Sequence, residues 1–131
     1  MKKILIIGGG AMGSAFTFPC IDNKNEVTIT EPYNKTFIKN LSSNKKYHSS
    51  LKINLPQKLK YKKYSTDLLK NKYNLVVVAL SLSGINFISE EFKKSKVKSP
   101  ILILTKGLKY EKKRQKIFTI SEDIKKTNKN I

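Results

Sequence analysis

Several residue types are scarce in this 131-residue chain, and each scarcity excludes a kind of site or protein. Cys20 is the only cysteine, so no disulfide can form within the chain, and a reducing cytoplasmic environment is expected. His48 is the only histidine, and the sequence has no Cys, His, Asp and Glu cluster with the spacing of a metal site. No apolar run approaches the roughly 18 residues that a membrane span requires.

Arginine and acidic residues are also scarce. Only Arg114 among the 27 basic residues is an arginine, and 9 acids leave a formal net charge of +18. Such a charge attracts anions, and a basic patch could neutralise nucleic-acid phosphates. Base readout and bidentate phosphate recognition favour the planar guanidinium, however, and the lysines are spread along the chain. We therefore interpret the charge as the coding bias of an AT-rich genome and expect no specific nucleic-acid partner.

Short apolar or β-branched segments predict strands over residues 3–7, 27–30, 59–64, 75–80 and 101–104. Helices are expected over 11–21, kinked or shortened by Pro19, over 34–41 and 67–72, and from Ser83 or Gly84 to about 96. Ser65 or Thr66 should cap the third helix, and Ser121 resembles a further helix start. Residues 42–57 are polar and are expected to form an irregular loop. Alternating strands and helices predict one α/β domain with a doubly wound, mostly parallel sheet of Rossmann type.

The segment Gly8-Gly9-Gly10-Ala11-Met12-Gly13 matches the pattern G-x-G-x-x-G between a predicted buried strand and a predicted helix. In this pattern Gly8 permits the tight turn, Gly10 lets the backbone approach a pyrophosphate, and Gly13 lets the helix pack against the strand. The start of the helix, at Ala11 and Met12, presents free N–H groups and about half a positive charge. The segment therefore predicts a dinucleotide-binding turn.

Glu31 ends the second predicted strand, 18 residues after Gly13. A carboxylate there accepts hydrogen bonds from the adenosine ribose and repels a 2′-phosphate, which favours NAD over NADP. The alternative is an ordinary loop glutamate. Ser81 and Thr105-Lys106 follow two other predicted strands, and ligands of parallel sheets bind at such strand ends. Lys106 there could hold a substrate carbonyl, hydroxyl or phosphate, or it could be simply solvated.

Three segments, GGGAMGSAFTFPCIDNKNEV, LVVVALS and LILTKGL, together resemble the N-terminal domain of NAD(P)-dependent glycerol-3-phosphate dehydrogenase in order and spacing. The resemblance covers essentially all 131 residues, and T-K-G-L is its most specific element. It implies a cytoplasmic oxidoreductase that reduces dihydroxyacetone phosphate to sn-glycerol 3-phosphate for phospholipid biosynthesis. It also implies that residues 8–13 bind NAD or NADP, that Ser81 lies near the nicotinamide, and that Lys106 contacts both coenzyme and glycerol phosphate.

The sequence departs from that family at Glu31 and Pro32, where a glycine and basic residues are common, and at Leu80, where a proline is common. The family's catalytic lysine and helical C-terminal substrate domain would follow Ile131, so we expect residues 1–131 to be a truncated dinucleotide-binding domain, inactive alone. The intact enzyme could be a homodimer. The alternatives are a stand-alone NAD-binding module like those that regulate potassium transport, and another reductase such as a ketopantoate reductase.

His48 and Cys20 are the remaining candidates for chemistry. His48 could be a general base, but it lies in the predicted polar loop, so we expect a surface histidine far from the strand ends. Cys20 follows Pro19 on a packed helix and should be a buried thiol rather than a nucleophile. A lipoprotein signal ending at Cys20 is disfavoured because Phe18-Pro19 are not the small residues that a signal peptidase requires.

Overall fold

The computed structural model describes residues 1–43 and 46–128, which form a central sheet of five parallel strands and two small antiparallel pairs. The order in the large sheet is β5-β2-β1-β6-β7. Its strands are β1 (Lys3–Ile7), β2 (Glu26–Thr30), β5 (Lys60–Tyr61), β6 (Leu75–Val78) and β7 (Ile101–Ile103). This order reverses between β1 and β6, so the predicted doubly wound parallel sheet of Rossmann type is confirmed.

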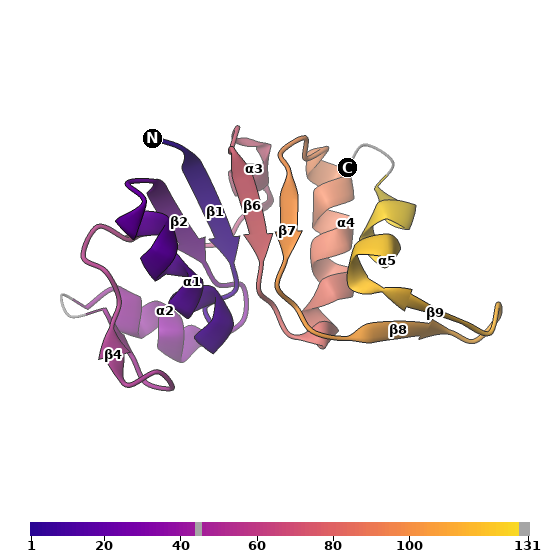
Figure 1. Cartoon of the computed structure of the whole chain (residues 1–131), viewed down its shortest axis with the longest axis horizontal. Coiled ribbons are helices and arrows are strands. Elements are labelled where there is room, and N and C mark those ends of the chain that lie inside the picture. Colours follow the sequence, from indigo (N-terminus) through magenta and orange to yellow (C-terminus); the bar gives the residue numbers. More distant parts are fainter. Residues whose placement is uncertain (44–45, 129–131) are drawn as a thin grey trace.

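Six helical segments connect or follow these strands. Figure 1 shows them around the sheet, whose carboxyl edge is at the bottom of that view. They are α1 (Ala11–Asp22), α2 (Lys35–Leu41), α3 (Thr66–Lys70), the 3₁₀ turn η1 (Leu82–Gly84), α4 (Ile85–Ser95) and α5 (Ile120–Thr127). Ser65 caps α3 as one of the two predicted caps, with its side chain 3.3 Å from Leu68 N. Pro19 does not shorten α1, which was expected over residues 11–21 and extends to Asp22.

The sheet separates two hydrophobic cores because successive strand residues point to opposite faces. Leu5, Ile7, Val76 and Val78 face α3, α4 and α5, whereas Ile4, Ile6 and Val77 face the core that contains Cys20 of α1 and Phe37 of α2. Cys20 is buried as predicted, and this burial raises the pKa of its thiol.

Glu91 of α4 is a buried carboxylate that ties α4 to the segment before α3. Its side chain accepts hydrogen bonds from the Thr66 hydroxyl, from Tyr64 Oη at 3.1 Å and from Lys94 Nζ at 3.1 Å. The Thr66 hydrogen bond, followed by those from Lys94 and Tyr64, holds the pKa of Glu91 below its usual value. Burial, together with the Glu91 charge, raises the pKa of Tyr64.

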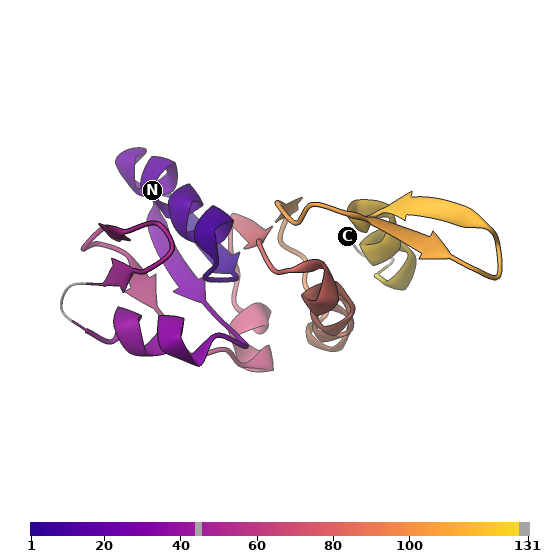
Figure 2. The same cartoon turned by 90° about the horizontal axis from the view of Figure 1, so that it is seen from below.

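The expected loop at 42–57 is wrong in part, since it contains the short pair β3 (Tyr47–His48) and β4 (Ile53–Asn54); residues 44–45 of that loop lie outside the described residues. A second pair was not expected at all: β8 (Leu108–Glu111) and β9 (Lys116–Thr119) form a hairpin that projects from the body (Figures 1 and 2). Helix α5 then begins at Ile120, just before the predicted Ser121, with Thr119 and Glu122 in a capping box.

One face of the β8–β9 hairpin is covered by α5 and the other is exposed. On the covered face Lys126 Nζ lies 2.8 Å from the Phe118 ring centroid, and Lys109 pairs with Asp123 at 2.8 Å. Residues paired directly across a hairpin share a face, so Tyr110 and Ile117 lie together on the other side. The hydrophobic side chains of that exposed face are 60–65% accessible: Leu108, Tyr110 and Ile117.

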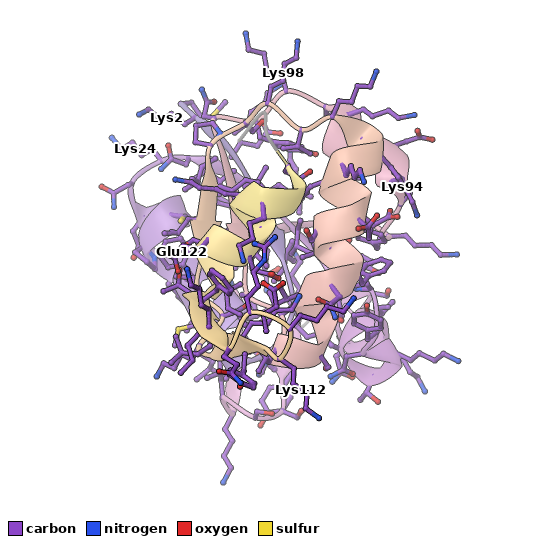
Figure 3. All side chains as sticks on the ribbon, turned by 90° about the vertical axis from the view of Figure 1, so that its right-hand side faces the viewer. Lys2, Lys24, Lys94, Lys98, Lys112 and Glu122 are labelled. Carbon is purple, nitrogen blue, oxygen red and sulfur yellow. The ribbon has the colours of Figure 1, made fainter. Side chains whose placement is uncertain are left out.

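The basic side chains are spread over much of the molecule. The lysines labelled in Figure 3 come from separate segments of the chain and lie at different places in that view. Other lysines lie at helix carboxyl ends, and Lys93 and Lys94 are both in the last turn of α4. Cations there complement the negative end of the helix dipole, which gives these lysines a structural role. Within the described residues, no helix is both long and apolar enough to cross a membrane.

Candidate functional site

The glycine turn joins β1 to α1 at the carboxyl edge of the sheet, beside the point where the strand order reverses. Gly8 has φ +114°, and a Cβ there would overlap the Ala79 carbonyl. A Cβ on Gly13 would overlap the Gly8 carbonyl and lie 3.0 Å from the Ala79 Cβ. Both glycines are therefore required for close packing of α1, β1 and the exit of β6.

Gly10 differs from these two glycines because open space surrounds its Cβ position, with nothing within 4 Å. Its backbone is extended at φ −66°, ψ 178°, and it is the N-cap of α1. The first helical hydrogen bond runs from Ser14 N to Gly10 O at 3.0 Å, so the N–H groups of Ala11, Met12 and Gly13 have no acceptor within the helix. The open space in front of this helix terminus suits an anion that accepts from these N–H groups.

Glu31 follows β2 and directs its carboxylate at the glycine turn. It is buried, and its Oε2 accepts from Gly9 N at 2.6 Å. Oε1 accepts from Tyr33 N at 2.7 Å and from Asn34 N at 3.1 Å. Glu31 therefore fixes the geometry of the turn and of the chain that enters α2, a role that the sequence did not indicate.

His48 is not the surface histidine that was expected. It is only 4% exposed, and its Nε2 lies 2.9 Å from Gly9 O while Nδ1 accepts from Leu51 N at 3.1 Å. Its ring also meets Phe37 edge-on, with centroids 5.6 Å apart. The pairing of β3 with β4 folds the polar segment back onto the glycine turn, so the expectation that His48 lies far from the strand ends is wrong.

Gly9, the variable position of the pattern, is the residue on which these contacts converge. Its N–H donates to Glu31, and its carbonyl accepts from Ser14 Oγ at 3.1 Å as well as from His48. A Cβ on Gly9 would overlap the Phe37 ring. A third consecutive glycine was the only local signal of this close packing.

A polar cavity of about 190 Å³ opens beside the glycine turn on the side of α2. It is lined by Gly9, Gly10, Asn34, Thr36, Phe37, Asn40, His48, Ser49 and Ser50. A larger cleft of about 690 Å³ lies at the opposite edge of the sheet, between the loops that follow α3 and α4. That cleft is lined by four lysines but lies at the amino edge of the sheet. Ligands of doubly wound parallel sheets bind at the carboxyl ends of the strands, so the smaller cavity is the better candidate for a dinucleotide.

Ser81 and Lys106 lie at the carboxyl ends of β6 and β7, on the same edge as the glycine turn. The two strand ends are tied together by Thr105 Oγ1, which donates to Leu80 O at 2.7 Å. Both side chains are exposed, and Ser81 Oγ lies 2.9 Å from Ser83 Oγ. Strand β6 separates Lys106 from the glycine turn, so Ser81 stands between them along the edge.

No group of three or more Cys, His, Asp and Glu residues that could hold a metal occurs in the described ranges 1–43 and 46–128. The site is thus built from backbone N–H groups, one carboxylate and hydroxyl, amide and lysine side chains. A glycine turn at the switch point of a doubly wound parallel sheet, with an acid after the second strand, defines the class of Rossmann-type nucleotide-binding domains.

The family follows from a sequence comparison. The profile described as NAD-dependent glycerol-3-phosphate dehydrogenase N-terminus matches residues 3–131, and the chain belongs to this family. No curated protein matches the chain in sequence.

Solved structures share the fold at low identity. Glycerol-3-phosphate dehydrogenase from Coxiella burnetii is 16% identical with a TM-score of 0.77, over 99% of this chain and 38% of that one. The enzyme from Plasmodium falciparum is 19% identical with a TM-score of 0.75, over 96% and 38%. A complex of D-mandelate dehydrogenase with NADH is 19% identical with a TM-score of 0.61, over 96% and 34%. The chain thus spans less than two fifths of the length of these proteins.

Proposed function

We propose that this chain binds the pyrophosphate of a nicotinamide coenzyme on the turn from Gly8 to Gly13. It would do so as the coenzyme-binding part of an enzyme that reduces dihydroxyacetone phosphate to sn-glycerol 3-phosphate. The observation that carries the proposal is the open space at Gly10 in front of the α1 N-terminus, between two glycines that are closely packed. A phosphate fits this arrangement because the N–H groups of Ala11, Met12 and Gly13 are free to donate.

The roles of the other residues follow from their places on the edge of the sheet. Glu31 has one carboxylate position left after its three backbone hydrogen bonds and would accept from a ribose hydroxyl. Its negative charge disfavours a 2′-phosphate, so NAD is the preferred coenzyme. Ser81 would face the nicotinamide end of the coenzyme, and Lys106 would hold both the coenzyme and the substrate phosphate.

The bound coenzyme supplies the hydride, and the chain contributes orientation and electrostatic attraction. Lys106 is exposed, with no carboxylate bonded to it among residues 1–43 and 46–128, so its charge is available to an anionic substrate. Carbonyl reduction also requires a proton donor, for which the family resemblance implies a catalytic lysine outside this domain. We therefore assign the proton donor to a C-terminal substrate domain, and the product to cytoplasmic phospholipid biosynthesis.

The first experiment is a calorimetric titration of the chain with NADH and with NADPH. We expect NADH to bind more tightly than NADPH, and we expect no oxidation of NADH when dihydroxyacetone phosphate is added. Proton transfer by a positioned group is worth about 10²–10⁴-fold in rate, and we assign that group to the C-terminal domain. Failure to bind either coenzyme would contradict the proposal, and robust turnover would contradict the assignment of the proton donor.

The second experiment tests Lys106 in a fusion of the chain to the C-terminal domain of a related glycerol-3-phosphate dehydrogenase. We expect turnover in the fusion and its loss in Lys106→Ala. The matched control is Lys109→Ala, a nearby lysine that pairs with Asp123 away from the strand ends. Equal activity of the Lys106→Ala fusion and the unaltered fusion would refute a substrate role for Lys106.

A further inference from the structure

His48 is buried against the glycine turn, and the proposed function gives it no task. Its two ring nitrogens have different partners, Gly9 O at 2.9 Å from Nε2 and Leu51 N at 3.1 Å from Nδ1. A carbonyl oxygen only accepts and a backbone N–H only donates, so Nε2 carries the hydrogen and Nδ1 carries none. His48 is therefore a neutral donor held in one orientation, and it donates to the backbone of the turn.

The Gly9–Gly10 peptide group receives this hydrogen bond. The peptide is trans, so the Gly9 carbonyl and the Gly10 N–H point in opposite directions. With the carbonyl directed at His48 and Ser14 Oγ, the Gly10 N–H is directed away from both. The Gly10 N–H makes no hydrogen bond within the described ranges 1–43 and 46–128, and the Cβ position of Gly10 faces open space.

We propose that His48 is a positioning residue for the coenzyme pyrophosphate: it orients the Gly9–Gly10 peptide so that the Gly10 N–H donates to a phosphate oxygen. This inference rests on the proposed function. The peptide requires such restraint because two consecutive glycines have no side chain to limit their rotation. Hydrogen bonding at the carbonyl also polarises the peptide and strengthens the N–H as a donor.

Three separate segments hold this one peptide unit and its neighbour. Ser14 comes from α1, Glu31 from the end of β2, and His48 from the β3–β4 pair, 39 residues from Gly9. His48 is the most distant of them and belongs to the pair that also lines the 190 Å³ cavity. His48 thus links the β3–β4 pair to the proposed phosphate site.

The experiment compares His48→Leu, which fills the same space without a donor, with His48→Gln, which keeps an N–H donor at similar reach. Both are titrated with NADH. We expect His48→Leu to bind NADH about three- to tenfold more weakly, the effect of one neutral hydrogen bond, and His48→Gln to bind within about twofold of the unaltered chain. The control is Leu55→Ala, which removes a buried side chain beside the same strand pair and should lower the melting temperature without changing affinity.

A second measurement serves if His48→Leu does not fold. In ¹H–¹⁵N spectra of the unaltered chain and of His48→Gln, the Gly10 amide proton should move downfield when NADH is added. A folded His48→Leu variant with unchanged NADH affinity, or a Gly10 amide that does not respond in the NADH-bound chain, would overturn the role of His48 alone. If the unaltered chain bound neither NADH nor NADPH, the proposed function would fail and this inference with it.

Discussion

Two glycines of the same turn should respond in opposite ways to an added side chain. A Cβ at position 10 meets no atom within 4 Å and the backbone there is extended, so Gly10→Val should change the free energy of unfolding by only about 1 kcal/mol, the cost of a poorer N-cap residue. The side chain would occupy the proposed phosphate position, however. Loss of two charge-assisted hydrogen bonds at about 1.5–3 kcal/mol each weakens binding by roughly 10²–10⁴-fold.

Gly13→Ala should show the reverse pattern. Its Cβ would overlap the Gly8 carbonyl, a backbone atom that cannot move without shifting β1. Overpacking of this kind costs about 1–3 kcal/mol, against about 1 kcal/mol gained from helix propensity, so a net loss of up to about 2 kcal/mol is expected. Urea unfolding and NADH calorimetry on both variants measure the two effects. A folded Gly10→Val variant with unchanged NADH affinity would refute the placement of the phosphate.

Three further substitutions test other parts of the structure. Glu31→Ser should narrow the preference for NADH over NADPH and lower stability, since three backbone N–H groups lose their acceptor; an unchanged affinity ratio would count against Glu31 as the selector. Glu91→Gln should destabilise the chain more at pH 7 than at acidic pH. The pKa of Glu91 is lowered in the folded chain, so its carboxylate stabilises the fold above about pH 4.3, the pKa of an unfolded glutamate. This stabilisation is lost as the pH falls through the pKa of Glu91 in the folded chain. Equal losses at both pH values would contradict this linkage. Lys96→Gly should raise the free energy of unfolding, measured in urea, by about 0.5–1 kcal/mol. Lys96 is the C-cap of α4 and has a left-handed backbone at φ 52°, where a side chain is strained. A loss of stability would show that this strain is negligible.

The parallel sheet was predictable because its signals are local. Four of the five strands lie in short apolar or β-branched runs, and the glycine turn directly follows the first of them. Strand β8 of the hairpin could also have been predicted, because residues 108–111 alternate apolar and charged side chains. This alternation lies within a cluster of lysines that was interpreted only as coding bias.

The environment of His48 could not be predicted in the same way. Nothing within its own segment indicates burial, because its partner Gly9 is 39 residues away and offers only a backbone carbonyl. The hydrogen bond that Glu31 accepts from Gly9 N could not be predicted for the same reason, because it depends on how β1 and β2 pair. Side chains that bond to a distant backbone are specified by tertiary packing, and residue type alone reveals little of it.

The exposed face of the β8–β9 hairpin makes the solution behaviour of this domain depend on ionic strength. At low salt the net charge of +18 repels one copy from another. The screening length falls from about 10 Å at 0.1 M salt to about 3 Å at 1 M, so this repulsion disappears, while Leu108, Tyr110 and Ile117 still gain by leaving water. We therefore expect added salt to move the chain from dispersed molecules toward self-association, opposite to the behaviour of assemblies held by ion pairs.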